Sequence, residues 1–85
     1  MEIRYRPRFV REYKKLPRPL QQLAEKRVAL FRENPYDSRL KTHKLHGDLE
    51  GFLAFWIDYH NRIMFAFMDE KTVEFYSIGD HDIYN

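Results

Sequence analysis

The chain has 85 residues, 44% of them hydrophobic and 16% aromatic, with no cysteine and a net charge of +2. This length supports one hydrophobic core, so we expect a single domain over residues 1–85, and the lack of cysteine excludes disulfides and thiolate metal sites. Neither a signal peptide nor an apolar run of membrane length is visible, which predicts a soluble, cytoplasmic protein with no membrane partner.

The charge is distributed unevenly along the chain. Residues 1–50 hold 13 Lys and Arg against 7 Asp and Glu, a balance of +6, whereas residues 51–85 hold 2 against 6, a balance of −4. A basic half favours a polyanionic partner, most simply nucleic acid. Two amphipathic helices with ordinary solvated Lys and Arg faces would carry the same charge, so composition alone leaves both interpretations open.

The first half predicts a short strand followed by a helical hairpin. "EIRYR", residues 2–6, alternates apolar and polar side chains with the period of a half-buried strand. Pro7 is suited to the first turn of a helix, in which apolar residues recur at helical spacing up to Leu16. "LPRPL" (16–20) ends this helix, and Pro19 can open a second one whose apolar stripe stops before Asn34-Pro35.

The second half changes to the period and composition of strands. Aromatic and β-branched runs occupy residues 52–60, 62–69 and 72–78, and residues 41–47 form a further extended segment. We expect a tight connection at residues 60–61 and a hairpin loop at residues 69–71. The predicted fold class is therefore α+β, an antiparallel sheet of about four strands with the helical hairpin packed on one face. The other face can carry a polar site.

Four histidines and one arginine are the candidate site residues of this second half: His43, His46, His60, His81 and Arg62. Taken singly, a strand arginine more often extends to the strand end, and a histidine near a terminus is more often simply solvated. His43 and His46 are three residues apart, which on a strand puts them on opposite faces. With no cysteine nearby, we predict no metal site.

Taken together, these residue types match the requirements of metal-free RNA cleavage. One group must take the proton from the ribose 2′-OH, and another must give a proton to the departing 5′-oxygen. Histidine suits both roles because its ordinary pKa lies near 6.5. A fixed cation must offset the charge that grows on the phosphorus centre, and the planar fork of arginine matches phosphate geometry.

The order of a strand, a basic helical hairpin and then "HKLHGDLEGF", "YHNRIMFAF" and "FYSIGDHDIY" resembles the RelE/ParE superfamily of bacterial toxin–antitoxin modules. Within it the chain is most similar to the RelE, YoeB and YafQ-type mRNA interferases. The resemblance covers nearly the whole chain, and its specific part runs from Leu45 to Tyr84. It implies a RelE-like fold for the single domain.

The resemblance also implies roles for individual residues. Arg62 matches the strand arginine that relatives place on the scissile phosphate, and His81 matches the histidine that YafQ-like members use as a proton donor. Tyr84 falls where related toxins end in a tyrosine that contacts the RNA, and His43 falls where relatives carry the base. These four are the predicted catalytic residues. The predicted RNA-binding residues are Lys41, Lys44, His46 and His60. Trp56 and Phe52 are left to the core or to the sheet face.

The function that the resemblance implies is the toxin of a type II toxin–antitoxin system, acting as an endoribonuclease on mRNA at the ribosome. Its partners would be an acidic antitoxin, mRNA and the 70S ribosome, and it would need no cofactor. Lys44 is one of few basic residues in the second half, which favours histidine-based chemistry over the lysine-rich chemistry of RelE. Two alternatives remain: a ParE-like toxin that inhibits DNA gyrase, and a degenerate member that only binds antitoxin.

Overall fold

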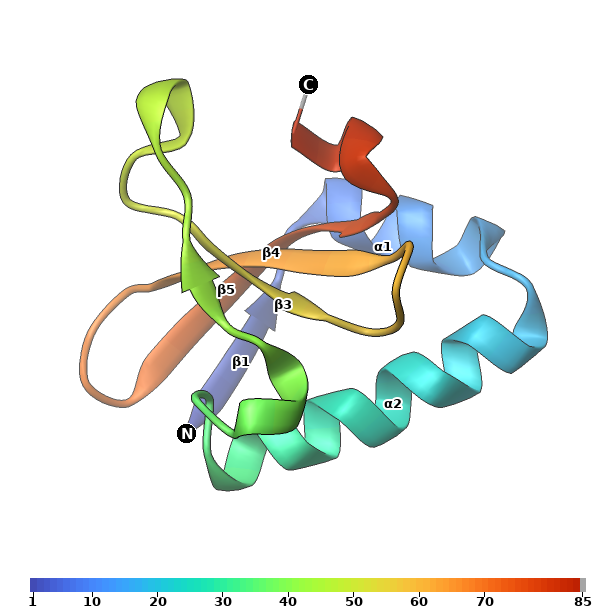
Figure 1. The fold of residues 1–85 in the computed structure, drawn as a ribbon, viewed down its shortest axis with the longest axis horizontal. Coiled ribbons are helices and arrows are strands. Elements are labelled where there is room, and N and C mark those ends of the chain that lie inside the picture. The colour runs from blue at the N-terminus through green and yellow to red at the C-terminus, as the bar shows by residue number, and fades with distance from the viewer. Residues whose placement is uncertain (85) are drawn as a thin grey trace.

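The computed structural model describes residues 1–84 and places two α-helices against a five-stranded sheet (Figure 1). The helices are α1 (Pro7–Lys15) and α2 (Arg18–Glu33). The strands are β1 (Glu2–Tyr5), β2 (His43–Lys44), β3 (Leu53–Trp56), β4 (Arg62–Phe67) and β5 (Thr72–Gly79). Three 3₁₀ helices complete the described part: η1 (Ser38–Leu40), η2 (Gly47–Leu49) and η3 (His81–Tyr84).

The sheet has the strand order β1-β5-β4-β3-β2. The pairs β2–β3, β3–β4 and β4–β5 are antiparallel. The pair β1–β5 is parallel, with Glu2 opposite Thr72 and Tyr5 opposite Phe75. The predicted α+β class and helical hairpin are confirmed. The sheet differs in detail: it has five strands, and one edge is parallel. A four-residue edge strand carries no pattern that states which strand it joins or in which direction.

The predicted strand over residues 52–60 is wrong in its second half, because β3 ends at Trp56. The carboxylate of Asp58 accepts hydrogen bonds from the backbone N–H groups of His60 (2.9 Å) and Asn61 (2.7 Å). An aspartate that binds backbone two residues ahead competes with the strand ladder and makes a turn. The connection between β3 and β4 is therefore a loop over residues 57–61.

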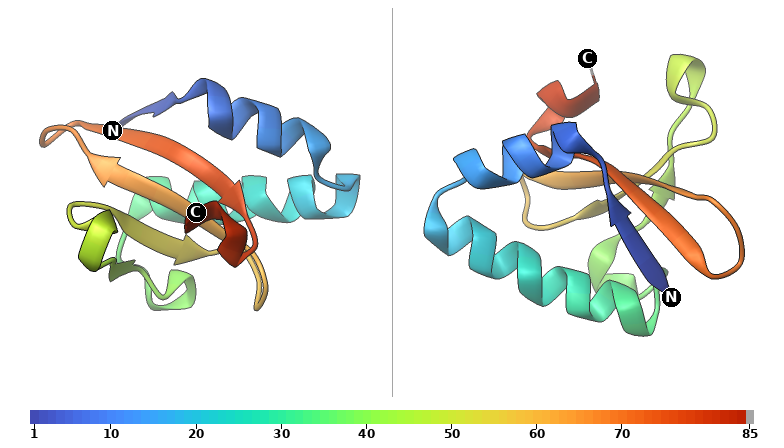
Figure 2. Two further views of the ribbon diagram at one scale, coloured as in Figure 1. Left: turned by 90° about the horizontal axis from the view of Figure 1, so that it is seen from above. Right: turned by 180° about the vertical axis from the view of Figure 1, so that it is seen from behind.

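The core lies between the sheet and the two helices. Phe31 of α2 is fully buried, with its ring centroid 4.8 Å from that of Phe55, 4.9 Å from Phe65 and 5.4 Å from Phe75. Phe9 of α1 joins the same cluster, 5.5 Å from Phe75. In Figures 1 and 2, α2 runs beneath the sheet and α1 lies beside β5. Both helices therefore cover one apolar face of the sheet.

Neither α1 nor α2 packs across the opposite face of the sheet (Figures 1 and 2). Ile63 and Phe65 of β4 point into the core, and alternation along a strand directs Arg62 and Met64 to the other side. This second side is called the open face below. Within residues 1–84, no helix combines the length and the apolar character needed to cross a membrane.

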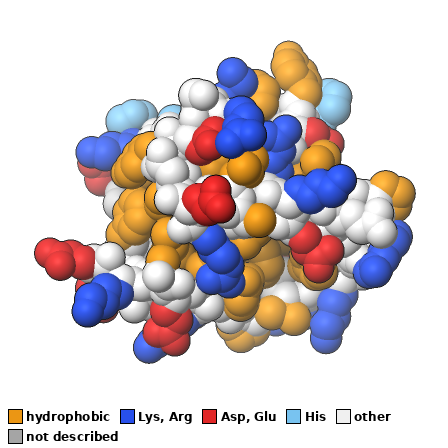
Figure 3. All heavy atoms as spheres, turned by 90° about the horizontal axis from the view of Figure 1, so that it is seen from below, with side chains coloured by type: hydrophobic (Ala, Val, Ile, Leu, Met, Phe, Trp, Pro, Cys, Tyr) orange, Lys and Arg blue, Asp and Glu red, His pale blue; other side chains and the backbone are white. Residues whose placement is uncertain are grey.

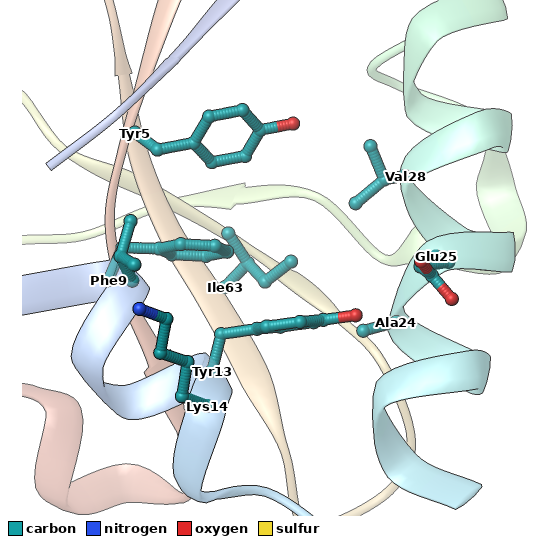
Figure 4. Close-up of a pocket in the computed structure, with 9 residues that line it drawn as sticks. Tyr5, Phe9, Tyr13, Lys14, Ala24, Glu25, Val28 and Ile63 are labelled. Carbon is teal, nitrogen blue, oxygen red and sulfur yellow. The ribbon is translucent and has the colours of Figure 1, made fainter. Parts of the chain in front are cut away.

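An apolar groove of about 430 Å³ separates α1 from α2 on the helical side. The rings of Tyr5, Phe9 and Tyr13 line one wall and Val28 faces them from α2 (Figure 4). Seen from the α2 side, apolar side chains gather between basic and acidic ones (Figure 3). The groove lies on the helical side of the sheet, away from the open face.

A candidate active site on the open face

A hollow of about 650 Å³ opens where β2, β3, β4 and η3 meet on the open face. Its lining comes from three separate segments of the chain, within residues 41–43, 56–62 and 81–84. The residues are Lys41, His43, Trp56, Tyr59, His60, Arg62, His81 and Tyr84. Six of the eight predicted site residues therefore share one hollow, although the first and last are about half the chain apart.

Arg62 is held rigidly at the edge of this hollow. Its Nη1 donates to three carbonyl oxygens of the preceding loop, those of Asp58 (2.7 Å), Tyr59 (2.9 Å) and Asn61 (3.2 Å). The guanidinium lies 3.9 Å from the ring centroid of Trp56, a cation–π contact. Nε and Nη2 form no hydrogen bond within residues 1–84, so the side chain is fixed through one nitrogen and keeps donors for an anion.

The loop that holds Arg62 is itself fixed by Asp58. Burial opposes the charged form of this carboxyl group, but hydrogen bonds from the Asn61 side chain and from the backbone N–H groups of Asn61 and His60 outweigh it. The net effect lowers the pKa of Asp58 below its ordinary value. The carboxylate is thus charged at neutral pH, and its donors shape the loop whose carbonyls receive Arg62.

His43 has one ring nitrogen committed and one left over. Its Nδ1 lies 2.9 Å from the carbonyl oxygen of Lys41, which adopts a left-handed conformation with φ of 52°. A carbonyl can only accept, so Nδ1 carries the proton of this hydrogen bond. In the neutral imidazole Nε2 is then the unprotonated nitrogen, which is the form that a general base needs.

The C-terminal 3₁₀ helix η3 brings His81 and Tyr84 to the hollow. Gly79 precedes it with φ of 152°, and a Cβ at this position would lie 3.1 Å from Cγ2 of Ile83. Ile83 is only 3% exposed and anchors η3 to the core side. Burial raises the pKa of the Tyr84 phenol, an effect that the nearby Arg62 guanidinium opposes. The phenol therefore stays protonated and can donate a hydrogen bond at neutral pH.

A chain of polar contacts fastens η3 to the rest of the molecule. Glu12 of α1 accepts from the Ser77 hydroxyl (2.6 Å) and the Ile78 N–H (3.1 Å), and its second oxygen accepts from Nε of Arg8 (3.3 Å). Nη2 of Arg8 donates to the Ile83 carbonyl at 2.8 Å. Ser77 is fully buried and lies beside a register shift in the β4–β5 pairing. Helix α1 therefore sets the position of η3.

Two of the predicted RNA-binding residues lie elsewhere. Lys44 and His46 line a separate hollow of about 170 Å³ beside η2, between β2 and β3. His43 pairs with Ala54 and Lys44 with Leu53, so their side chains leave β2 on opposite faces. Within residues 1–84, no three His, Asp or Glu side chains gather in a way that could hold a metal ion.

Two aromatic residues of the hollow were not predicted as site residues. Trp56 faces both Arg62 and Lys41, whose Nζ lies 5.4 Å from its ring centroid. Tyr59 is 73% exposed at the loop tip, with its ring centroid 5.9 Å from that of Trp56. Trp56 pairs with Arg62 across the ladder. Centring the turn on residue 59 would have revealed this pairing from the sequence.

No family model and no curated protein matches the sequence. Solved structures do match over almost the whole chain. The YoeB/ParE toxin from Agrobacterium tumefaciens has a TM-score of 0.81 at 14% identity, covering 95% of this chain and 99% of its own. YafQ from E. coli has a TM-score of 0.80 at 16% identity, covering 95% of this chain and 93% of its own. A chain of the E. coli DinJ-YafQ toxin-antitoxin complex has a TM-score of 0.77 at 16% identity, covering 95% of this chain and 92% of its own. The predicted RelE-like architecture is confirmed: the chain has the fold of the YoeB and YafQ toxins.

Proposed function

We propose that this protein is the toxin of a type II toxin–antitoxin module and an endoribonuclease that cleaves mRNA. The observation that carries the proposal is the state of Arg62, which is fixed through Nη1 while Nε and Nη2 remain available within the described residues 1–84. Two imidazoles, those of His43 and His81, line the same hollow. A fixed cation and two proton-transfer groups in one hollow are the groups that metal-free phosphodiester cleavage requires.

The proposed reaction uses these residues in the following roles. Nε2 of His43 takes the proton from a ribose 2′-OH, and the 2′-oxygen attacks the adjacent phosphorus. Arg62 binds the non-bridging oxygens, whose charge grows in the transition state. His81, as the imidazolium, gives its proton to the departing 5′-oxygen. The products are a 2′,3′-cyclic phosphate, which water can open to a 3′-phosphate, and a 5′-hydroxyl. Tyr84 donates a hydrogen bond, and Trp56 supports Arg62.

Expression of the chain without a partner should stop translation and leave DNA supercoiling unchanged. Message should be cut, on the 70S ribosome, into fragments that end in a cyclic or 3′-phosphate, because the attacking group is the neighbouring 2′-OH. Cleavage should require no metal ion other than the magnesium that the ribosome itself needs. End-group analysis of the fragments provides the measurement. Gyrase-linked DNA breaks with intact message would instead support the gyrase-inhibitor alternative.

The proposed protein partner is an acidic antitoxin. YafQ has been solved in a toxin-antitoxin complex with DinJ. The apolar groove between α1 and α2 offers a docking surface for an amphipathic segment, with Lys14 and Glu25 in its lining. Residues 1–50, which include both helices, carry a balance of +6. An acidic segment would therefore gain both apolar burial and electrostatic attraction.

Association with the acidic antitoxin that we propose should slow as salt rises. Long-range attraction between exposed charges is screened beyond a Debye length, about 10 Å at 0.1 M salt, so steering weakens while the apolar contact persists. Stopped-flow association rates over a salt series provide the measurement. A rate that does not change with salt would contradict the electrostatic part of the proposal. Val28→Glu, which places a charge in the groove, should weaken the complex at every salt concentration.

A further inference from the structure

We propose that the open face carries a second nucleotide subsite, an arginine-lined hollow that binds the ribonucleotide next to the scissile phosphate. This inference rests on the proposed RNA-cleaving function. The hollow has a volume of about 280 Å³. Its lining residues are Arg6, Pro7, Arg8, Arg11, Met64 and Tyr76. Pockets for drug-sized ligands begin at roughly 300 Å³, so this one suits a single base with its phosphate.

The side chains of this hollow combine an aromatic ring with free cations. The Arg6 guanidinium lies 5.6 Å from the ring centroid of Tyr76. Arg11 is exposed on α1 and forms no hydrogen bond or ion pair within residues 1–84. Arg8 is already committed to Glu12 and to the Ile83 carbonyl. Arg6 and Arg11 therefore remain for phosphate. Tyr76, which is half-buried and meets the Phe52 ring at right angles with centroids 4.7 Å apart, remains for a base.

The acidic groups nearby are accounted for. Both carboxylate oxygens of Glu12 accept hydrogen bonds from protein donors, among them Arg8. Glu74, two residues before Tyr76, hydrogen-bonds to its phenol and raises the pKa of that group. No carboxylate lines the hollow itself.

The subsite lies in register with the candidate active site. Met64 in its lining is two residues from Arg62 on the same face of β4, a separation of about 6.8 Å along a strand. This distance is comparable with the step between successive phosphates of an extended single strand. Arg8 also contacts Ile83 of η3, the helix that carries His81. One strand of RNA can therefore occupy both hollows.

A single-stranded nucleic acid fits this chemistry better than an acidic peptide. Unpaired bases stack on tyrosine rings and on arginine planes, and arginine forks bind phosphate. A peptide carboxylate would use the arginines but would leave the Tyr76 ring without a matching group. An apolar peptide has its own groove on the helical side, between α1 and α2.

The test measures binding separately from cleavage. A five-nucleotide RNA with one 2′-deoxyribose at its central position cannot be cut there, and its affinity is read by fluorescence anisotropy at several salt concentrations. Arg6→Gln and Tyr76→Leu should each weaken binding by about 10-fold. Arg11→Gln should lower the log–log salt slope by about 0.7, the value for one lost phosphate contact on a single strand. Arg32→Gln in α2 makes the same charge change away from the open face, and it should alter neither the affinity for the RNA nor the salt slope.

Each outcome separates the subsite from the proposed nuclease. If Arg32→Gln lost as much RNA affinity as Arg6→Gln, the attraction would be diffuse and the subsite would be overturned. Failure of the wild-type chain to bind the oligonucleotide would also overturn it. Loss of antitoxin binding without loss of RNA binding in Arg6→Gln would assign the hollow to a protein and also overturn it. Specific binding without any cleavage on ribosomes would leave the subsite standing and remove the nuclease function. Circular dichroism of each variant checks that it is folded.

Discussion

Arg62→Ala should lower the rate of RNA cleavage by about 10²–10⁴-fold, in the range of other groups that stabilise developing charge. Arg62→Lys should recover little of this loss. The wild-type side chain uses Nη1 to bind the loop carbonyls and keeps Nε and Nη2 for phosphate. A lysine has a single nitrogen, which cannot serve both purposes. Single-turnover cleavage on ribosomes with a defined message in the A site provides the measurement.

A control is needed because Arg62 also supports its loop. Antitoxin binding and the denaturation midpoint should be measured for both variants, and Lys71→Ala offers a matched loss of one cation in an exposed turn of the same sheet. Lys71→Ala should cleave at the wild-type rate. If Arg62→Lys proved as active as wild type, the bidentate role would be wrong and a simple point charge would suffice.

His81→Ala should lower the cleavage rate by about 10²–10⁴-fold, because the departing 5′-oxygen would leave without a proton. A substrate whose bridging 5′-oxygen is replaced by sulfur needs no such proton, since a thiolate is a far better leaving group. The defect of His81→Ala should therefore largely disappear with the sulfur substrate. The comparison of the two substrates distinguishes a general acid from a residue that only shapes the hollow.

The matched control for this experiment is His46→Ala. His46 lies in the separate hollow beside η2, so its loss should leave cleavage on both substrates close to wild type. His43→Ala should be slow on both substrates, because the attacking 2′-OH still needs its base when the leaving group is sulfur. A His81→Ala variant that remained equally slow on the sulfur substrate would refute the proton-donor role.

Much of the fold was predictable because local patterns fix it. Proline at the first turn and apolar side chains at helical spacing predicted α1 and α2, and aromatic runs predicted β4 and β5. The pairing of β1 with β5 was not predictable, because it joins the two ends of the chain and leaves no local signal. The loop after Trp56 was missed because Asp58 makes backbone hydrogen bonds that a hydrophobic pattern does not report.

The candidate site followed the same division. Arg62, His81 and Tyr84 could be proposed from their segments, and the structure brings them together with His43. Lys44 and His46 stand beside His43 in the sequence, yet alternation along β2 and the turn into η2 carry them to another hollow. Trp56 was assigned to the core or sheet face because an aromatic residue is expected in a strand. The strand pattern does not show whether its ring also contacts a cation, as it does with Arg62.

The parallel pairing of β1 with β5 has a consequence for how the protein is made. β1 is synthesised well before β5, since Glu2 pairs with Thr72, so this edge of the sheet cannot close until β5 has also left the ribosome. Pairings between segments distant in the chain form late and limit folding. The hydrogen bonds of Glu12 with Ser77 and of Arg8 with Ile83 also cannot form before β5 and η3 have been synthesised. A nascent chain that stops short of β5 and η3 therefore presents no assembled hollow on the open face.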